Sequence, residues 1–434
     1  MSVLGEVRLR LGVPDVRGRG PQIGAVVVDT LGVGLFLPVS LLYFTIATDV
    51  PVASIGSALS LGAVLALPMG LLGGTLVDRS SARAVMVLNN LLAAAGYVLY
   101  TVSGGVATIF AGALLIGTAD RLFWACWPPY VTRLAGEDPF DQWFAFLEGM
   151  KAACFAVGAG AGSLLLAAGG GQAVRLLPLL NVVSCVVAAA LFLSRPDGPR
   201  KTPAAARPAV RPGATGDAVS WSAVLGPGHL LLALGQVFFA PIWLLGNLAL
   251  PVFYIRAWGL RPWLPSALFA LSCVVVFLAQ TPAVNAVRRV PRPRVIGLAA
   301  VAVSAAMALL LAVQATGTRS PAVHLGTSVG VAVLLATGYL LYMPAANALA
   351  MEATTDGTRG KVAALFDVGT AIAAALAPAA MGLLVATRAP SLWWGTVVFA
   401  GLGVTCLASA RRVLSARRGS ASTSTGPRPA DRSR

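Results

Sequence analysis

The feature that most constrains this chain is a series of apolar runs, each about 20 residues long, separated by short polar connections. A helix of about 20 apolar residues crosses the hydrocarbon core of a bilayer. Because backbone polar groups find no water there, an open chain crosses it as helices. The sequence therefore predicts an all-α polytopic membrane protein. Its twelve predicted spans are 22–46, 53–77, 84–103, 106–131, 142–168, 174–194, 229–254, 263–287, 294–316, 322–350, 361–387 and 390–410.

Composition and charge agree with this prediction. The chain is 57% hydrophobic and 11% charged, whereas soluble domains carry about 25% charged residues. Its net charge of +16 does not indicate nucleic-acid binding, because Lys and Arg lie between apolar runs and form no compact basic surface. With both termini inside, 25 of the 32 Lys and Arg residues fall on the cytoplasmic side and five on the other. This asymmetry predicts a multi-pass protein of the cell membrane with cytoplasmic termini.

The apolar runs fall into two sets, which define the predicted domains. A basic segment, 1–21, lacks the apolar core of a secretory signal. A six-helix bundle at 22–194 is followed by a cytoplasmic linker, 195–228, rich in Pro, Ala and Arg. The second bundle, 229–410, precedes a basic tail, 411–434, whose composition predicts disorder.

The two sets also resemble each other in sequence. ACWPPYVTRLA in the fourth span aligns Pro128 with Pro344 of LYMPAANALAM in the tenth, and FLEGMKAA in the fifth aligns Glu148 with Asp367 of LFDVGTAI in the eleventh. The offset is 216 residues in the first alignment and 219 in the second. Two matches at nearly the same offset indicate internal duplication. Two related six-helix bundles predict a pathway between them.

The connection after the second span, GTLVDRSSARAVMVL, resembles the loop signature GxLaDrxGrk of the major facilitator superfamily. The matching residues are Gly74, Leu76, Asp78, Arg79 and Arg83, whereas Ser81 and Ala82 replace a Gly and an Arg. The resemblance implies a twelve-helix transporter in which this loop closes the cytoplasmic side against the eleventh span. Independently, Gly70 and Gly74 form a GxxxG step, which predicts close helix approach, and Asp78 suits the positive end of a neighbouring helix.

Other motifs resemble the drug:proton antiporters of that superfamily. DTLGVGLFLPVSLLYF in the first span is similar to their pattern there, and Arg121 occupies the place of their embedded Arg. Gly149, Gly158 and Gly162 fit the fifth-span signature gx8Gx3GPx2GG, but Ser163 replaces its Pro. The resemblance implies proton-coupled export, and the incomplete fifth-span match keeps import or facilitated transport open.

Charged residues inside the spans are the candidate coupling residues, because charge in hydrocarbon costs roughly 2.5 to 3.5 kcal/mol and marks functional sites. A rise of about 1.5 Å per residue places them in one layer of the cytoplasmic half. They are Asp29, Asp120, Arg121, Glu148, Lys151 and Asp367.

Spacing predicts how these charges pair. Glu148 and Lys151 are three residues apart and can pair on one helix face. Asp120 and Arg121 are adjacent and point about 100° apart, which predicts different partners. We expect Arg121 to pair with Asp29 or Glu148, and Asp120 to meet another helix or the cytoplasmic interface.

Proton coupling follows as a hypothesis from these charges. Asp29 is the first candidate proton carrier, Glu148 or Asp367 is the second, and Arg121 would tune or displace the proton as substrate arrives. The energy source would be a proton gradient, with no cofactor. The alternative is that the charges are structural ion pairs that fix helices together.

Aromatic residues on pathway helices suggest a bulky apolar or cationic small-molecule substrate. Lipid contact, an interfacial belt or core packing is the alternative for each. The candidate cavity residues are Phe36, Tyr43, Phe123, Trp124, Trp127, Phe239, Trp243, Tyr339 and Tyr342.

No enzyme signature accompanies this pattern. HExxH, GxxxxGK[ST], CxxC and clustered His are absent, and five single cysteines indicate neither a metal site nor disulfides. The sequence predicts a monomeric secondary transporter, not an enzyme, that exports a small organic molecule in exchange for protons. The alternatives are a proton-coupled importer or facilitator of a sugar, organic acid or amino acid, and a membrane sensor.

Overall fold

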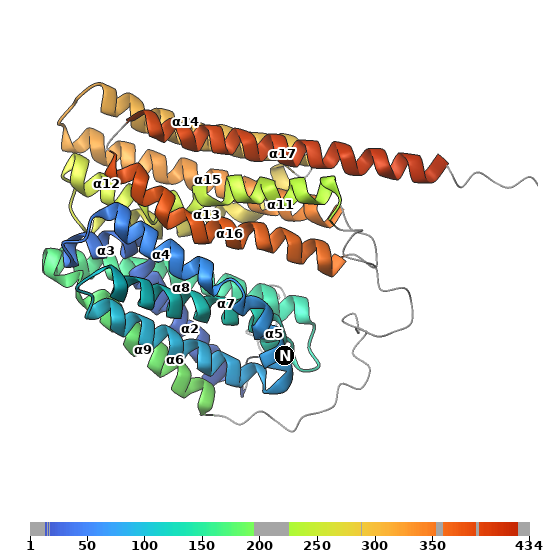
Figure 1. The fold of residues 1–434 in the computed structure, drawn as a ribbon, viewed down its shortest axis with the longest axis horizontal. Coiled ribbons are helices and arrows are strands. Elements are labelled where there is room, and N and C mark those ends of the chain that lie inside the picture. Colours follow the sequence, from blue (N-terminus) through green and yellow to red (C-terminus); the bar gives the residue numbers. More distant parts are fainter. Residues whose placement is uncertain are drawn as a thin grey trace, which may run out of the picture.

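The computed structural model describes residues 14, 16, 18–194, 225–287, 289–352, 359–387 and 390–423, and its regular elements there are all helices. They form two bundles side by side (Figure 1). The helices of the N-terminal half are α2 (Gly20–Phe36), η1 (Leu37–Val39), α3 (Ser40–Ala47), α4 (Val52–Ala66), α5 (Met69–Arg79), α6 (Ala82–Thr101), α7 (Val106–Ala135), α8 (Phe140–Ala173) and α9 (Leu176–Leu193). Those of the C-terminal half are α11 (Pro227–Phe239), η2 (Ala240–Leu245), α12 (Ala249–Trp258), α13 (Leu264–Val287), α14 (Arg292–Ala315), α15 (Pro321–Glu352), α16 (Arg359–Ala386) and α17 (Pro390–Thr423).

Each predicted span coincides with one helix or with consecutive helices. In the described part of the chain, nine helices are long and apolar enough to cross a membrane. Shorter apolar helices, Val52–Ala66, Pro227–Ile242 and Leu264–Gln280, occupy the second, seventh and eighth predicted spans. The all-α polytopic fold is confirmed, and the predicted count of twelve fits these elements.

The predicted terminal and linker segments fall largely on residues that are not described, namely 1–13, 15, 17, 195–224 and 424–434. The expectation of a disordered tail from residue 411 is wrong as far as Thr423, because α17 continues to that residue. Ala, Ser and Arg in this stretch are compatible with a helix, and the stretch continues the α17 helix beyond the predicted membrane span.

Proline breaks some spans and not others. Pro38 lies in η1, the 3-10 turn between α2 and α3, and Pro241 lies in η2 at the corresponding place in the C-terminal half. A proline removes a backbone donor and so interrupts the α-helical hydrogen bonds. Pro128 and Pro129 lie inside α7, which continues through both.

The two halves repeat one packing arrangement, as the predicted duplication requires. Within the N-terminal half α2 packs on α8 and α9, α6 on α7 and α9, and α4 on α7. Within the C-terminal half α11 packs on α16 and α17, α14 on α15 and α17, and α13 on α15. The contacts between halves are also related, since α4 packs on α16 and α8 on α13. Equivalent helices thus have equivalent neighbours.

The ends of the bundle differ in how the halves meet. We call the end with Gly20, Leu193 and Pro227 the linker side, and the other end the far side (Figure 1). On the far side, a methyl group built on Gly56 of α4 would lie 2.3 Å from the carbonyl oxygen of Pro378 in α16. Such proximity places the two helix backbones in direct contact, which only small residues allow.

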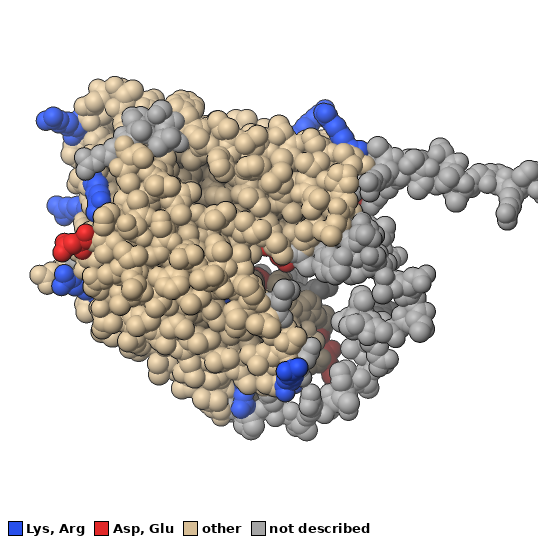
Figure 2. All heavy atoms as spheres, in the orientation of Figure 1, with Lys and Arg blue, Asp and Glu red and all other residues tan. Residues whose placement is uncertain are grey.

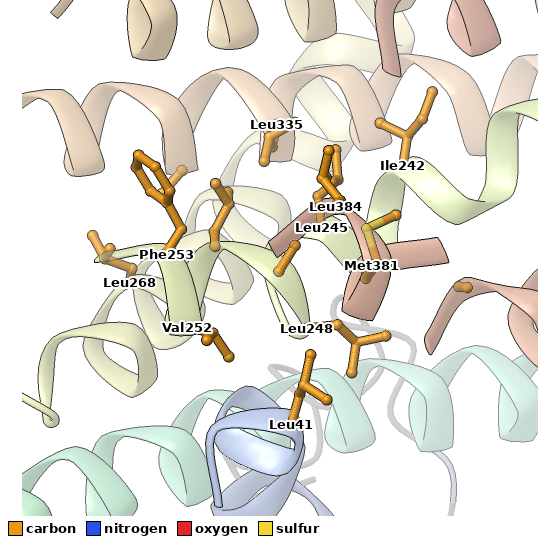
Figure 3. Close-up of a cluster of buried hydrophobic side chains, with 14 of the residues drawn as sticks. Leu41, Ile242, Leu245, Leu248, Val252, Phe253, Leu268, Leu335, Met381 and Leu384 are labelled. Atoms are coloured by element: carbon orange, nitrogen blue, oxygen red, sulfur yellow. The ribbon is translucent and has the colours of Figure 1, made fainter. Parts of the chain in front are cut away.

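Polar and apolar contacts complete this far-side closure. The Ala379 N–H donates to Ser60 Oγ at 2.8 Å, and Ser163 Oγ donates to the Trp263 carbonyl at 3.1 Å. Figure 3 shows Leu41 of the N-terminal half directed towards Leu248 and Val252 of the C-terminal half. These residues bury apolar surface across the junction, which closes the far side of the protein.

Candidate functional site

Arg121, Glu148 and Asp367 of the predicted charge layer lie where the two halves meet. Figure 2 shows a hollow opening on the linker side with acidic atoms inside it. Charges of the two halves face each other across the layer. The positive charge of Arg121 on α7 acts on Asp367 of α16, and Glu148 of α8 lies within electrostatic range of Tyr339 of α15. The site is therefore shared by both halves.

The best-defined part of the site is an ion pair inside an aromatic box. Lys151 Nζ lies 3.2 Å from Glu148 Oε1, as their spacing predicts. The same ammonium lies 5.0, 4.8 and 4.6 Å from the ring centroids of Phe123, Trp124 and Trp127. These three rings and Glu148 form what we call the aromatic box. Only 8% of the Lys151 side chain is exposed, so the box replaces water around its charge.

Hydrogen bonding and stacking fix the walls of the box. Trp127 Nε1 donates to Glu148 Oε1 at 2.8 Å, which orients the carboxylate that pairs with Lys151. Phe123 stacks on Trp127 with centroids 5.2 Å apart and meets Trp124 edge to face at 5.3 Å. Trp127 is 1% exposed, whereas Trp124 is 51% exposed. The box therefore has a rigid inner wall and one open wall.

The predicted partners of Arg121 are wrong. Its Nη2 donates to the carboxylate of the adjacent Asp120 at 2.5 Å, and neither Asp29 nor Glu148 pairs with it in the described residues. The error came from treating the 100° between neighbouring Cβ directions as decisive. The Arg121 side chain is long enough to turn back, and the exposed fractions of 23% for Arg121 and 46% for Asp120 show that both are partly open to solvent.

Asp29 lies in a polar region of the N-terminal half. The charge of Lys151 acts on it, and Tyr97 of α6 and Cys185 of α9 are within electrostatic range. Among the described residues, none forms a hydrogen bond or a close ion pair with its carboxylate. Its nearest compensating charge is therefore a lysine that is already paired with Glu148.

The C-terminal half has an uncharged counterpart of this arrangement. Gln236 is the tenth residue of α11, as Asp29 is of α2, and the sequence alignment of α8 with α16 pairs Lys151 with Thr370. Gln236 Nε2 donates to Thr370 Oγ1 at 3.1 Å, and the Tyr342 hydroxyl donates to Gln236 Oε1. At these two aligned positions the N-terminal half holds ionisable groups and the C-terminal half holds neutral ones.

The loop motif is placed after α5, and its glycines differ from the expected GxxxG contact. A methyl group built on Gly74 would meet no atom within 4 Å, whereas one on Gly73 would lie 2.8 Å from Ala125 Cβ of α7. The close helix approach is therefore at Gly73, and the prediction for Gly74 is wrong by one position because the helix presents a different face. Ser81 accepts the Ala84 N–H at 3.1 Å as the cap of α6.

The expected gate contacts of this motif are only partly described. The Asp78 side chain lies outside the described side chains, and Arg79 is exposed. Arg83 is partly exposed in the first turn of α6. On this side the described helix α5 packs chiefly on α6 and α7 of its own half. The gate role of Gly74, Asp78, Arg79 and Arg83 remains a prediction.

Several predicted cavity aromatics belong to the core. Phe36 and Tyr43 pack with Tyr97 and Tyr100, and the Tyr43 hydroxyl donates to the Tyr100 carbonyl at 2.7 Å. In the other half Phe239 lies stacked on Tyr342, with centroids 3.9 Å apart. Four predicted cavity residues are almost fully buried and are not among the residues that line the cavity described below, so their cavity role stays a prediction; they are Phe36, Tyr43, Phe239 and Tyr342. The Trp243 side chain lies outside the described side chains.

Tyr339 instead lines a cavity of about 330 Å³ between the halves. Leu37 of η1 and Ala152 and Phe155 of α8 line it from the N-terminal half, and α12, α13, α15 and the turn before α12 line it from the C-terminal half. The lining is mostly apolar, with Asn247 and Ser272 among its polar groups. Since Ala152 follows Lys151 and Tyr339 is in range of Glu148, the cavity adjoins the aromatic box.

Two features of the site were missed by sequence reasoning. The box around Lys151 is one, although Phe123 and Trp127 at a spacing of four residues did indicate a common helix face. The uncharged Gln236 and Thr370 pair is the other, and the aligned eleventh span could have found it. In the described residues no group of three or more His, Cys, Asp and Glu side chains could hold a metal ion.

Comparison with known proteins identifies the family. Residues 23–312 match the family model described as Major Facilitator Superfamily. The chain belongs to the major facilitator superfamily. It is therefore a multi-pass membrane protein with a transporter fold, as the loop motif implied, whereas the drug:proton antiporter subtype stays a prediction. A search of curated proteins found no match.

Solved transporters of this superfamily fold share the architecture over almost their whole length. The nucleoside transporter NupG superposes with a TM-score of 0.67 at 16% identity, covering 91% of this chain and 98% of its own. A second match is a bacterial homolog of the human lysosomal transporter Spinster in an inward-facing and occupied conformation. Its TM-score is 0.67 at 13% identity, and the match covers 90% of this chain and 96% of the homolog. A POT family transporter in complex with 5-aminolevulinic acid has a TM-score of 0.64 at 14% identity, and the match covers 92% of this chain and 95% of that transporter. Such low identities establish the fold alone.

Proposed function

We propose that this protein is a secondary active transporter that exports a small organic molecule in exchange for protons. The observation that carries the proposal is the charge layer at the inner end of a hollow between the two halves, opposite a tightly packed far side. Charges in that position meet water and substrate from one side only in a given conformation. Alternating access then exposes the same charges to the other side.

Proton coupling is assigned to the N-terminal half. Asp29 and Lys151 occupy positions where the C-terminal half has Gln236 and Thr370, so at these two aligned positions only the N-terminal half has groups that change charge. Asp29 is the proposed proton carrier, because among the described residues no hydrogen bond holds its carboxylate in the ionised state. The Arg121 and Asp120 pair would respond to substrate at the mouth of the site.

The test is substrate flux into proteoliposomes with and without an imposed pH gradient, using a panel of cationic dyes, antibiotics and sugars. Asp29→Asn should abolish the dependence of flux on the gradient, because an amide cannot exchange a proton. Asp138→Asn is the matched control, since Asp138 pairs with Arg19 on the linker side, away from the charge layer. Absence of gradient-dependent flux for every compound would exclude proton-coupled transport, and unchanged coupling in Asp29→Asn would exclude Asp29 as the carrier.

Import or facilitated transport is the second candidate, favoured by one observation. Ser163 stands where the antiporter signature has Pro, and its hydroxyl bonds the Trp263 carbonyl across the halves. Vesicles with the pH gradient imposed in either direction separate the two: an exporter accumulates substrate against the proton flow, and a symporter accumulates it with that flow.

A further inference from the structure

We propose that the aromatic box binds the ammonium group of a cationic substrate, and that Lys151 fills the box as an internal substitute when no substrate is present. This names a substrate class for the transporter proposed above, and it rests on that function. The ligand would be an organic amine in its charged form, or a quaternary ammonium compound, with an apolar remainder.

The geometry of the box is that of a cation site. Three ring centroids lie between 4.6 and 5.0 Å from one ammonium nitrogen, and a carboxylate oxygen lies 3.2 Å from it. Aromatic faces attract cations through their quadrupoles, most strongly where water is excluded, and such cages recognise quaternary ammonium ligands. A lysine that only needed a counter-ion would require Glu148 but not three rings.

Access to the box is open on one side. Trp124 is 51% exposed and the Glu148 side chain 38%, while Lys151 itself is nearly buried. Both described hydrogen bonds to Glu148, from Trp127 and Lys151, reach Oε1. A second cation can therefore approach Oε2 and the face of Trp124 without first opening the protein.

The charges around the box favour replacement of Lys151 by a cationic ligand. The layer holds four carboxylates, Asp29, Asp120, Glu148 and Asp367, against two cations, Arg121 and Lys151. Its formal charge with all six ionised is negative, so an incoming cation brings it nearer to neutrality. Lys151 also has an alternative partner, because Asp29 is within range of its charge.

The neighbouring cavity supplies room for the rest of such a molecule. Ala152 and Tyr339 line the cavity of about 330 Å³ and lie next to the box. Pocket volumes of about 300 to 1,000 Å³ are usual for small organic ligands. A ligand with its ammonium in the box can place an aliphatic or aromatic body against this apolar lining.

Competition by Lys151 sets the size of the expected effect. A ligand binds in proportion to the fraction of molecules whose site is free. If Lys151 fills the box in about nine molecules of ten, removing it strengthens binding about tenfold. The gain in affinity should be specific to positively charged ligands, because the box attracts a cation but not an uncharged molecule of the same size.

The binding test uses choline and its uncharged isostere 3,3-dimethylbutan-1-ol, titrated by calorimetry into the purified full chain. Lys151→Ala should bind choline at least about tenfold more tightly than the unaltered protein and should not gain affinity for the alcohol. Lys151→Arg, which keeps a tethered cation, should stay near the unaltered affinity. Adding Trp124→Ala to Lys151→Ala should remove the gain. Equal gains for both ligands, no gain for choline, or the same gain in Lys151→Arg would each overturn the proposal.

A measurement on the unaltered chain does not depend on any variant folding. The sequence has only three lysines, Lys151, Lys201 and Lys361. With lysine labelled by ¹³C at Cε, the Lys151 signal should be displaced upfield by the three rings, with Lys151→Arg giving its assignment. Choline at increasing concentration should move that signal towards the position of an exposed lysine. A Lys151 signal that stays in place while choline binds elsewhere would contradict the proposal.

These measurements are made in detergent without any gradient, so they are independent of transport. Choline binding that displaces Lys151, combined with flux that ignores pH, would leave the cation site in place and exclude proton coupling. Gradient-dependent flux with no displacement of Lys151 would retain the proposed function and remove this site.

Discussion

Substitution of Gly56 by Ala should open the far side of the protein. Gly56 of α4 lies against α16, where a Cβ atom would come within 2.3 Å of the Pro378 carbonyl oxygen and 3.2 Å of Gly382 Cα. Both are atoms of a helix backbone and cannot rotate away as a side chain would. The two helices must therefore separate by about 1 Å to reach ordinary van der Waals contact.

The magnitude follows from the cost of overpacking, which is typically about 1 to 3 kcal/mol. This cost falls only on conformations in which α4 and α16 touch, so it shifts the equilibrium between far-side-closed and far-side-open states by about 5-fold to 150-fold. If about 1% of molecules are open on the far side at the start, about 5 to 60% should be open afterwards.

The assay measures the distance between spin labels on the two halves. Cysteines introduced at Asp49, before α4, and at Thr387, after α16, are both exposed and lie on the far side. They are labelled in a chain from which the five native cysteines have been removed. The longer-distance population should grow in Gly56→Ala.

The control for this experiment is Gly297→Ala in α14. It gains the same helix propensity, up to about 1 kcal/mol, but its added methyl meets no atom within 4 Å. It should leave the distance distribution unchanged. If Gly56→Ala also leaves it unchanged, the backbone contact at Gly56 does not hold the far side closed, and the reasoning fails.

Further predictions concern contacts that stabilise the fold, each checked by thermal melting in detergent. Tyr342→Phe removes the hydroxyl that bonds Gln236 in the core, so it should cost about 1 to 3 kcal/mol and lower Tm; an unchanged Tm would show that this bond adds nothing. Trp127→Phe keeps a ring but loses the N–H bond to the partly exposed Glu148, which should lower the free energy of unfolding by about 1 kcal/mol. If Glu148→Gln lowers it more than Trp127→Phe does, the ion pair with Lys151 contributes more than this hydrogen bond. Ser81→Ala should cost about 1 kcal/mol as a lost helix cap, whereas Ser81→Asp should retain stability.

The loop glycines and the charges illustrate what local spacing can predict. Glu148 and Lys151 pair as expected, because a separation of three on one helix fixes their proximity whatever surrounds them. Gly73 rather than Gly74 meets α7, because the face of α5 that contacts a neighbour depends on how the helices are rotated against each other. Sequence spacing leaves that rotation undefined.

Arg121 shows a second limit of sequence reasoning. Helix geometry gave Arg121 and Asp120 different directions, yet the Arg121 guanidinium lies on Asp120, since four rotatable bonds allow the side chain to turn back. Side-chain rotamers depend on the space around them. The buried positions of Phe36 and Tyr342 have the same origin, because an aromatic on a pathway helix can face the core of its own half.

The sequence by itself determined the membrane fold, the helix positions, the duplicated halves and the residues of the charge layer. The thickness of the bilayer sets the length of every span, and charged residues are rare inside spans because they are costly there. Both features can therefore be recognised in the sequence. Only the tertiary structure decided which side is closed, where Gly56 meets Pro378, and that three rings from α7 enclose Lys151 of α8. Those contacts depend on the rotation and separation of helices, which result from packing over the whole protein.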